Sequence, residues 1–284
     1  GLGDVYKRQP TADAGQPLYV ELGVANDVAR FGSLGNQTEQ ETAAIVNALS
    51  MLYRHASDDQ DADPNFEPDM EIVLVEQVTF IDDEPWDAPP PLGGGEIDEL
   101  ALLYNFLEWA QPNMKGDNFQ LYSNQDFSGQ TIGKAFVRSM CLYEHSGAVI
   151  QTTHSNAADA AVAAHEMGHN LGMVHDGTST AQWDARACDS SQYIMSAMAN
   201  VNAPQSSFSN CSKGALTALF NSGTLSCLQN QPPQPGGRCG DGVLNLGEDC
   251  DCGQADCSDI DPCCHGLTCT GVTGNDCQDG DGID

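Results

Sequence analysis

Residues 165–176 have the sequence HEMGHNLGMVHD, and this stretch constrains the fold of the chain more than any other. His165 and His169 lie four positions apart, so on a helix their side chains share one face. The run before them, residues 156–164, is rich in alanine, which favours a helix, and Asn156 can cap its start. The spacing therefore predicts a helix that presents two imidazoles side by side.

The same stretch contains a third imidazole, His175, and a carboxylate, Glu166, which directly follows the first histidine. Gly172 can adopt the left-handed conformation that ends a helix, so the chain can turn back and bring His175 to the first two histidines. Three neutral imidazoles are a known ligand set for catalytic Zn²⁺, and they leave one position for water. Glu166 can take a proton from that zinc-bound water as it attacks a peptide carbonyl. The pattern predicts amide hydrolysis; the alternative is a helix that carries histidines on one face without a metal.

This stretch resembles the zinc-binding signature of the metzincin metallopeptidases, and Asp176 after the third histidine is similar to their adamalysin (reprolysin, or ADAM) branch. The resemblance implies a methionine turn beneath the metal, which Met195 in the sequence YIMS would supply. Tyr193 stands where the family usually has a cysteine. Ala197 stands where other metzincin branches place a tyrosine ligand, which argues for the adamalysin branch. The resemblance implies a zinc endopeptidase that cleaves protein or peptide substrates with Glu166 as general base.

Alternating patterns predict an α/β fold over residues 17–230. Short apolar runs at 18–24, 72–78 and 148–152 alternate with helical patterns at 38–55, 97–110 and 156–171. The family resemblance covers the same region and implies a metzincin catalytic domain, with a mixed twisted sheet, long helices and a zinc cleft. In that family the substrate binds as an extended strand along the sheet edge, which we expect at Gly147–Gln151.

Composition divides the chain into four parts. Residues 1–16 match no family pattern and are interpreted as an unstructured leader or scar, and residues 17–230 form the peptidase domain. Residues 231–238 are a proline- and glycine-rich linker. Residues 239–284 hold eight cysteines and few large apolar side chains, so disulfides or bound ions must replace a core. This small, mostly irregular segment resembles a truncated disintegrin domain, and its acidic end is either a calcium-binding repeat or a solvated tail.

The twelve cysteines divide into four before residue 230 and eight after it. Even counts favour disulfides and an oxidising compartment, so we expect an extracellular protein, secreted or at the cell surface. Free buried thiols are the alternative. The family resemblance implies the pairs Cys141–Cys227 and Cys188–Cys211.

Two sets of oxygen donors match calcium sites of the same family. In the peptidase domain these positions are Glu21, Asp117, the carbonyl of Cys227 and Asn230. In the disintegrin-like segment they are Asp241, Asn245, Glu248 and Asp251. Carboxylate, amide and carbonyl oxygens suit a hard cation, so the resemblance implies structural Ca²⁺ beside Zn²⁺. The alternative is that these residues are ordinary surface polar groups.

Charge limits the classes of partner. Ten Lys and Arg residues against 41 Asp and Glu residues give a net charge of −31, which disfavours nucleic-acid and anionic-membrane partners. No run of about 18 apolar residues predicts a membrane span within the chain. The alternative function is a catalytically vestigial, calcium-dependent adhesion or binding protein. Inactive relatives typically lose the glutamate or a histidine of the motif, whereas this chain keeps Glu166 and the three histidines.

Overall fold

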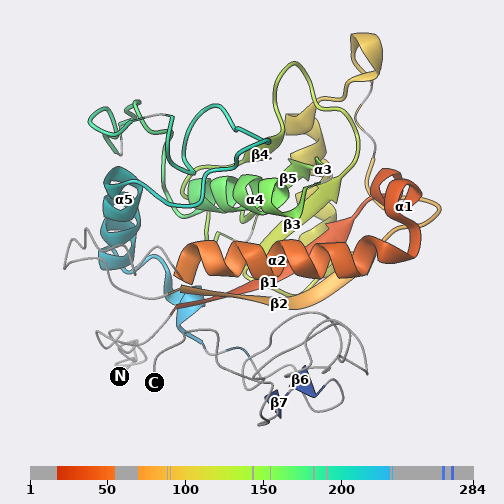
Figure 1. The fold of residues 1–284 in the computed structure, drawn as a ribbon, viewed down its shortest axis with the longest axis horizontal. Coiled ribbons are helices and arrows are strands. Elements are labelled where there is room, and N and C mark those ends of the chain that lie inside the picture. Colours follow the sequence, from red (N-terminus) through yellow and green to blue (C-terminus); the bar gives the residue numbers. More distant parts are fainter. Residues whose placement is uncertain are drawn as a thin grey trace, which may run out of the picture.

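A five-stranded sheet forms the centre of the molecule (Figure 1). In this computed structural model, residues 18–54 and 70–232 are described, apart from 88, 90, 143, 154, 182, 190 and 231, together with 264–265 and 270–271. The strands are β1 (Leu18–Asn26), β2 (Met70–Thr79), β3 (Asn118–Ser123), β4 (Gly133–Ala135) and β5 (Gly147–Gln151), in the order β2-β1-β3-β5-β4. Only β4 runs antiparallel to its neighbour within this sheet. The predicted mixed α/β class is therefore confirmed.

Helices bury both faces of this sheet. Helices α2 (Thr38–Arg54) and α4 (Asn156–Asn170) cover one face, and α3 (Glu99–Asn113) covers the other (Figure 1). Successive strand residues point to opposite faces, so Ile150 packs on the α4 side and its neighbour Val149 packs on the α3 side. The molecule thus has two apolar cores, one on each side of the sheet.

Helix α4 lies in the larger core, and its composition allows this. Eleven of its 15 residues are buried, and its alanines favour the helix while letting neighbouring elements approach closely. The predicted cap at Asn156 was wrong, because Asn156 is already helical. The extended residue Ser155 caps the helix by accepting a hydrogen bond from the Ala158 amide. The Asn156 side chain instead donates to Glu41 of α2, at 2.6 Å.

Two short helices and three 3₁₀ turns had no clear signal in the sequence. They are α1 (Val28–Leu34), α5 (Asn210–Asn221), η1 (Gly35–Gln37), η2 (Gly93–Gly95) and η3 (Ser226–Gln229). Side-chain caps begin both helices, since Asp27 accepts from Arg30 and Ser209 accepts from Ser212. Two further strands, β6 (Cys264–His265) and β7 (Thr270–Gly271), pair with each other.

Among the described helices, none has the length and apolar character needed to cross a membrane.

The sheet edge beside the motif differs from the prediction. We expected Gly147–Gln151 to form this edge, but that segment is β5, which pairs with β3 on one side and with β4 on the other. The edge is β4, whose three residues are too few to show an alternating pattern in the sequence. An extended peptide would therefore pair with Gly133–Ala135.

Two disulfides connect segments that are distant in the sequence. Cys141, in the turns after β4, is bonded to Cys227 in η3, 86 residues later. Cys188 is bonded to Cys211 in α5, 23 residues later. The first links the middle of the domain to its C-terminal part, and the second links the loop after the motif to α5.

Replacing both cysteines of one pair by serine should destabilise the protein according to loop length. By the chain-entropy relation we expect a loss in unfolding free energy of about 4.6 kcal/mol for Cys141–Cys227 and about 3.4 kcal/mol for Cys188–Cys211, whose loops span 86 and 23 residues. Urea unfolding of the two variants checks this order.

Non-reducing peptide mapping should recover both pairs from secreted protein, and Cys141 linked to any other cysteine would contradict the structure.

Candidate metal centre and cleft

Three histidine rings converge at the C-terminal end of α4. The Nε2 atoms of His165 and His169 each lie 3.2 Å from Nε2 of His175, and the three ligand atoms all lie within 4.8 Å of one another. His165 and His169 come from successive turns of α4. His175 reaches them because the helix ends at Asn170 and Gly172 takes a positive φ of 86°.

Backbone carbonyls orient two of these rings. Nδ1 of His165 lies 2.7 Å from the carbonyl oxygen of Ile194, and Nδ1 of His169 lies 2.9 Å from that of Met173. A carbonyl only accepts hydrogen bonds, so each Nδ1 carries the proton and each Nε2 presents its lone pair. Burial lowers the pKa of His165 to about 3 and that of His169 to about 4, which keeps both rings neutral. Burial also lowers the pKa of His175.

This donor set fits Zn²⁺. Neutral imidazoles are ligands that zinc accepts, and Zn–N distances near 2.0–2.1 Å in tetrahedral geometry place neighbouring nitrogens ~3.3 Å apart. The two Nε2–Nε2 distances of 3.2 Å agree with this value. A second cluster, Asp176 with Cys188 and Cys211, does not offer thiolates because its two cysteines form a disulfide.

Met195 packs against α4, the helix that carries His165 and His169. It is fully buried, and a Cβ atom on Gly168 would come within 2.6 Å of its Sδ atom. With any larger residue at position 168, the Met195 thioether would have to shift from this place against α4. The Asp176 amide donates to the carbonyl of Met195 at 2.9 Å, and the Asp176 carboxylate accepts from Ser209 at 2.6 Å. Asp176 thus connects the third histidine to both the methionine turn and the start of α5.

Glu166 lies between α4 and the edge strand β4. Its side chain is buried, and burial raises its pKa to about 8, while the charge of Lys134 acts in the opposite direction. A Cβ atom on Gly133 would collide with the Glu166 carboxylate. The Glu166 carboxylate therefore occupies the space that a side chain at residue 133 would fill.

Asn170 holds the end of α4 against the sheet. Its side-chain carbonyl oxygen accepts a hydrogen bond from the side-chain amide of Asn118 in β3, at 2.7 Å. Its amide nitrogen lies 2.9 Å from both the carbonyl of Phe136 and the hydroxyl of Ser139, and 3.2 Å from the carbonyl of Gly147. The side chain is fully buried, so these bonds replace all of its contacts with water. One residue after His169, the helix is thus tied to β3, to β5 and to the turn that follows β4.

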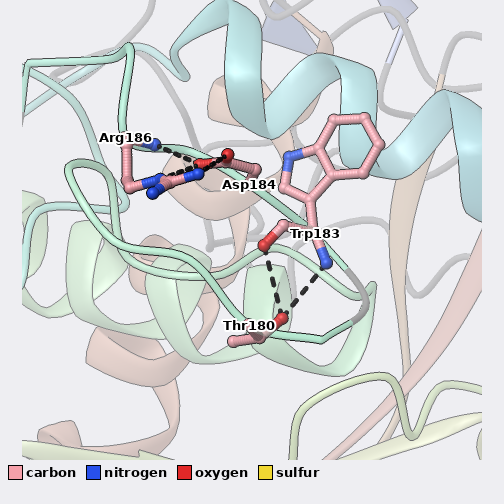
Figure 2. A network of polar contacts seen from close by, with 4 residues as sticks. All are labelled: Thr180, Trp183, Asp184 and Arg186. Carbon is pink, nitrogen blue, oxygen red and sulfur yellow. Dashed lines mark hydrogen bonds and ion pairs between the residues drawn. The ribbon is translucent and has the colours of Figure 1, made fainter.

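A polar network braces the loop between His175 and the methionine turn (Figure 2). The Trp183 amide donates to the Thr180 hydroxyl at 3.1 Å, and the Trp183 ring nitrogen donates to the Cys211 carbonyl of α5 at 2.9 Å. Arg186 pairs with Asp184 at 2.5 Å, but both groups are exposed, so this pair contributes little stability. The loop is therefore held mainly by Trp183 and the neighbouring disulfide.

A cleft of about 760 Å³ opens over the three histidines and Glu166. One wall is β4 with its flanking residues from Gln130 to Val137, and α4 adds Ala161 and Val162. The segment from Ile194 to Gln205 and the loop residue Thr180 also line the cleft. The cleft therefore joins the edge strand β4 to the three histidines.

The residues matched to the peptidase-domain calcium site also come together. The Glu21 amide donates to the Asp117 carboxylate at 3.2 Å, and the Asn230 side chain donates to the Glu21 carboxylate at 3.3 Å. Cys227 lies in η3 just before Asn230. Burial, with the charge of Glu21 adding to it, raises the pKa of Asp117 to about 6. The second set, Asp241, Asn245, Glu248 and Asp251, lies outside the described residues.

Sequence reasoning assigned no role to several residues of this site. They are Gly133, Lys134, Gly168, Asn170, Ile194 and the cleft wall after Met195. Asn170 stands inside the histidine motif, and its position between two candidate ligands was the only available signal. The others act through backbone atoms, through a missing side chain or through a fold-dependent contact.

Comparisons with known proteins match this chain to one family. Residues 96–232 match the reprolysin (M12B) family of zinc metalloproteases. Disintegrin and metalloproteinase domain-containing protein 12 of Mus musculus is 34% identical over 89% of this chain, which spans 27% of that relative. Disintegrin and metalloproteinase domain-containing protein 33 of Homo sapiens is 37% identical over 65% of this chain, which spans 23% of that relative. The solved archaemetzincin of Methanopyrus kandleri is 13% identical, with a TM-score of 0.43 over 71% of this chain and 96% of that one.

The Asn170 network predicts a large loss of stability when its hub is removed. Asn170→Ala removes four hydrogen bonds made by one buried side chain. The Asn118 amide keeps its bond to Ser146 and the Phe136 carbonyl keeps its bond from Ser139, so we expect the unfolding free energy to fall by about 2–3 kcal/mol. Asn221→Ala, at the exposed end of α5, is the control and should change it by less than about 0.5 kcal/mol. Urea unfolding measures both, and equal effects would show that the network does not hold α4.

Proposed function

Because this chain carries an ADAM-type reprolysin metalloprotease domain, we propose that it is a zinc-dependent endopeptidase that hydrolyses peptide bonds of proteins. The observation that carries the proposal is the convergence of three neutral imidazoles beside a buried glutamate in an open cleft. The chain spans about a quarter of the length of the relatives compared above, so the activity of a whole protein of that kind is also a proposal.

His165, His169 and His175 are the proposed zinc ligands. When bound there, zinc supplies a Lewis acid that makes water more acidic and polarises a carbonyl oxygen. The chain's own residues do the rest of the chemistry. Glu166 takes the proton from the attacking water and passes it to the leaving amine, for which it is suited because it is adjacent to a ligand but is not itself a ligand.

The free edge of β4 is the proposed binding surface for the substrate backbone. Its amides and carbonyls can pair with an extended peptide, as an added strand does at a sheet edge. The apolar wall residues Val137, Ala161 and Val162 then contact substrate side chains. Affinity comes from backbone pairing, and preference comes from the side-chain contacts.

The alternative is a vestigial fold that serves only calcium-dependent binding. The intact set of Glu166 and three histidines in the cleft favours catalysis over this alternative. The paired cysteines support secretion or display at the cell surface, because disulfides persist in oxidising compartments. The division into a leader, a peptidase domain at 17–230, a linker and a disintegrin-like segment stays a prediction, as does any adhesion partner.

Glu166→Ala should abolish peptide hydrolysis and leave zinc bound. The ligand set is intact in this variant, but no group takes the proton, so we expect a rate below about one hundredth of the wild-type rate. Zinc content by elemental analysis and cleavage of a peptide library measure the two effects separately. Glu108→Ala removes an exposed carboxylate of α3 and is the control, which should keep both the zinc and the peptide cleavage of the wild type. Substantial hydrolysis by the Glu166 variant would mean that another group is the base, and an inactive wild type that holds zinc would favour the vestigial alternative.

We also propose that Glu21, Asp117, the Cys227 carbonyl and Asn230 bind a structural Ca²⁺. Support comes from the contacts among three of these residues, and from the burial that makes the Asp117 charge costly without a cation beside it. A cation there would connect β1, the start of β3 and η3. In the disintegrin-like segment, Asp241, Asn245, Glu248 and Asp251 remain a weaker calcium proposal.

Calcium should raise the melting temperature of the zinc-loaded chain. A ligand at a hundred times its dissociation constant adds roughly 2.7 kcal/mol to the stability of the state that binds it. Asp117→Ala should melt at about the calcium-free temperature whether or not calcium is added, whereas Glu108→Ala should respond like the wild type. Calorimetry with a chelator that leaves zinc in place checks this. A wild-type response that persists in Asp117→Ala would assign the calcium to another site.

A further inference from the structure

A peptide paired with β4 would have two kinds of side-chain environment. Such a peptide extends the sheet by one strand, so its side chains point alternately to the two sheet faces. Every second side chain points toward α4 and the metal centre. Those in between point to the opposite face, which α3 covers. The proposed peptidase function uses only the first face.

The residues of β4 show the same alternation. Gly133 lies opposite Ile150, which packs on the α4 side. Lys134 lies opposite Val149, which packs on the α3 side. Phe136, two residues after Lys134, packs against the same core as α3. The edge therefore presents Lys134 and Phe136 on the face away from the histidines.

Helix α3 adds exposed apolar side chains to this face. Leu100 and Tyr104 lie one turn apart on α3 and are 41% and 51% exposed. The Tyr104 ring packs edge-on against Phe136, with ring centroids 5.0 Å apart. We call Leu100, Tyr104 and Phe136 the α3 surface. Phe136 directly precedes Val137, a residue that lines the cleft.

The charges beside the α3 surface indicate which side chain it accepts. Two described residues that can carry a positive charge lie at this face. Lys134 already pairs with Glu99 at 3.9 Å, and the His145 ring packs edge-on against Phe136, with ring centroids 4.8 Å apart. Glu99 in turn accepts from Ser128 at 2.6 Å. A charged substrate side chain would therefore compete with an existing pair, whereas an apolar one would cover the exposed parts of Leu100 and Tyr104.

We propose that the α3 surface is a second subsite, which binds an apolar or aromatic side chain of the peptide on the sheet face opposite the metal centre. The inference rests on the proposed peptidase function and adds a substrate preference to it. Aromatic side chains fit best, because the Tyr104 ring is about half exposed and can pack against another ring, whereas Phe136 already contacts both Tyr104 and His145. The preference applies only to a substrate position whose side chain points to this face, and the residues on either side of that position point toward the metal centre.

A positional peptide scan of the full zinc-loaded chain tests the proposal. Each residue flanking a cleaved bond is changed in turn from Ser to Phe, and kcat/KM is measured for the wild type and for Tyr104→Ser. We expect Phe to raise wild-type kcat/KM about five- to tenfold at one or more positions that face α3, through KM. Tyr104→Ser should lose this gain and cleave the Ser peptides at the wild-type rate. Met51→Ser is the matched control, because Met51 is also a helical side chain about half exposed (54%).

A binding measurement separates this subsite from the chemistry. Fluorescence anisotropy with the Glu166→Ala chain gives Kd for labelled Phe and Ser peptides, and adding Tyr104→Ser should abolish their difference. If the wild type cleaves the peptides but Phe gives the same gain in Tyr104→Ser, the α3 subsite is wrong and the peptidase function stands. If the wild type cleaves no peptide and the Phe and Ser peptides bind alike, the α3 subsite and the peptidase function are both overturned.

Discussion

The packing of helix α4 against the sheet and beside α2 determines the position of every candidate catalytic group. Because 11 of its 15 residues are buried, the helix cannot rotate or slide without disturbing the larger core. Two ligand candidates and Glu166 therefore occupy fixed places, and the chain after the helix has to be arranged around them. Gly172 supplies the turn, Met173 and Ile194 supply carbonyls that orient the imidazoles, and Asp176 connects the returning chain to α5. A site of this kind needs few polar contacts of its own, because apolar packing provides most of the rigidity.

Missing side chains are as important here as the groups that react. Gly168 permits the thioether of Met195 to lie against the helix, and Gly133 leaves space for the Glu166 carboxylate beside the edge strand. Each glycine is constrained by a neighbour from a different part of the sequence. A methyl group at either position would require the facing side chain, Met195 or Glu166, to move from the place it occupies here.

The sequence was sufficient for the parts of this structure that depend on local patterns. Spacings of three and four residues placed His165, His169 and Glu166 on one helix, and alternating apolar runs located β1, β2 and β5 to within a few residues. The cap was placed one residue late, because Ser155 and Asn156 are both good caps and only the backbone conformation distinguishes them. The edge strand β4 was missed because its position cannot be read from a local pattern. Three residues of β4 carry no periodicity, and whether a strand lies inside a sheet or at its edge depends on contacts distant in sequence. The Asn170 network depends in the same way on β3 and on the turn after β4.

The short length of β4 limits what can enter the cleft. An exposed sheet edge can pair with any extended chain, including the edge of another folded domain. Three residues offer too few backbone hydrogen bonds to hold such a rigid partner. A segment must therefore leave its own secondary structure before it can lie along β4 over the histidines. Under the proposed function, local unfolding of the target protein becomes part of recognition, so linkers and frayed termini are favoured over sequences of equal composition inside stable helices or sheets.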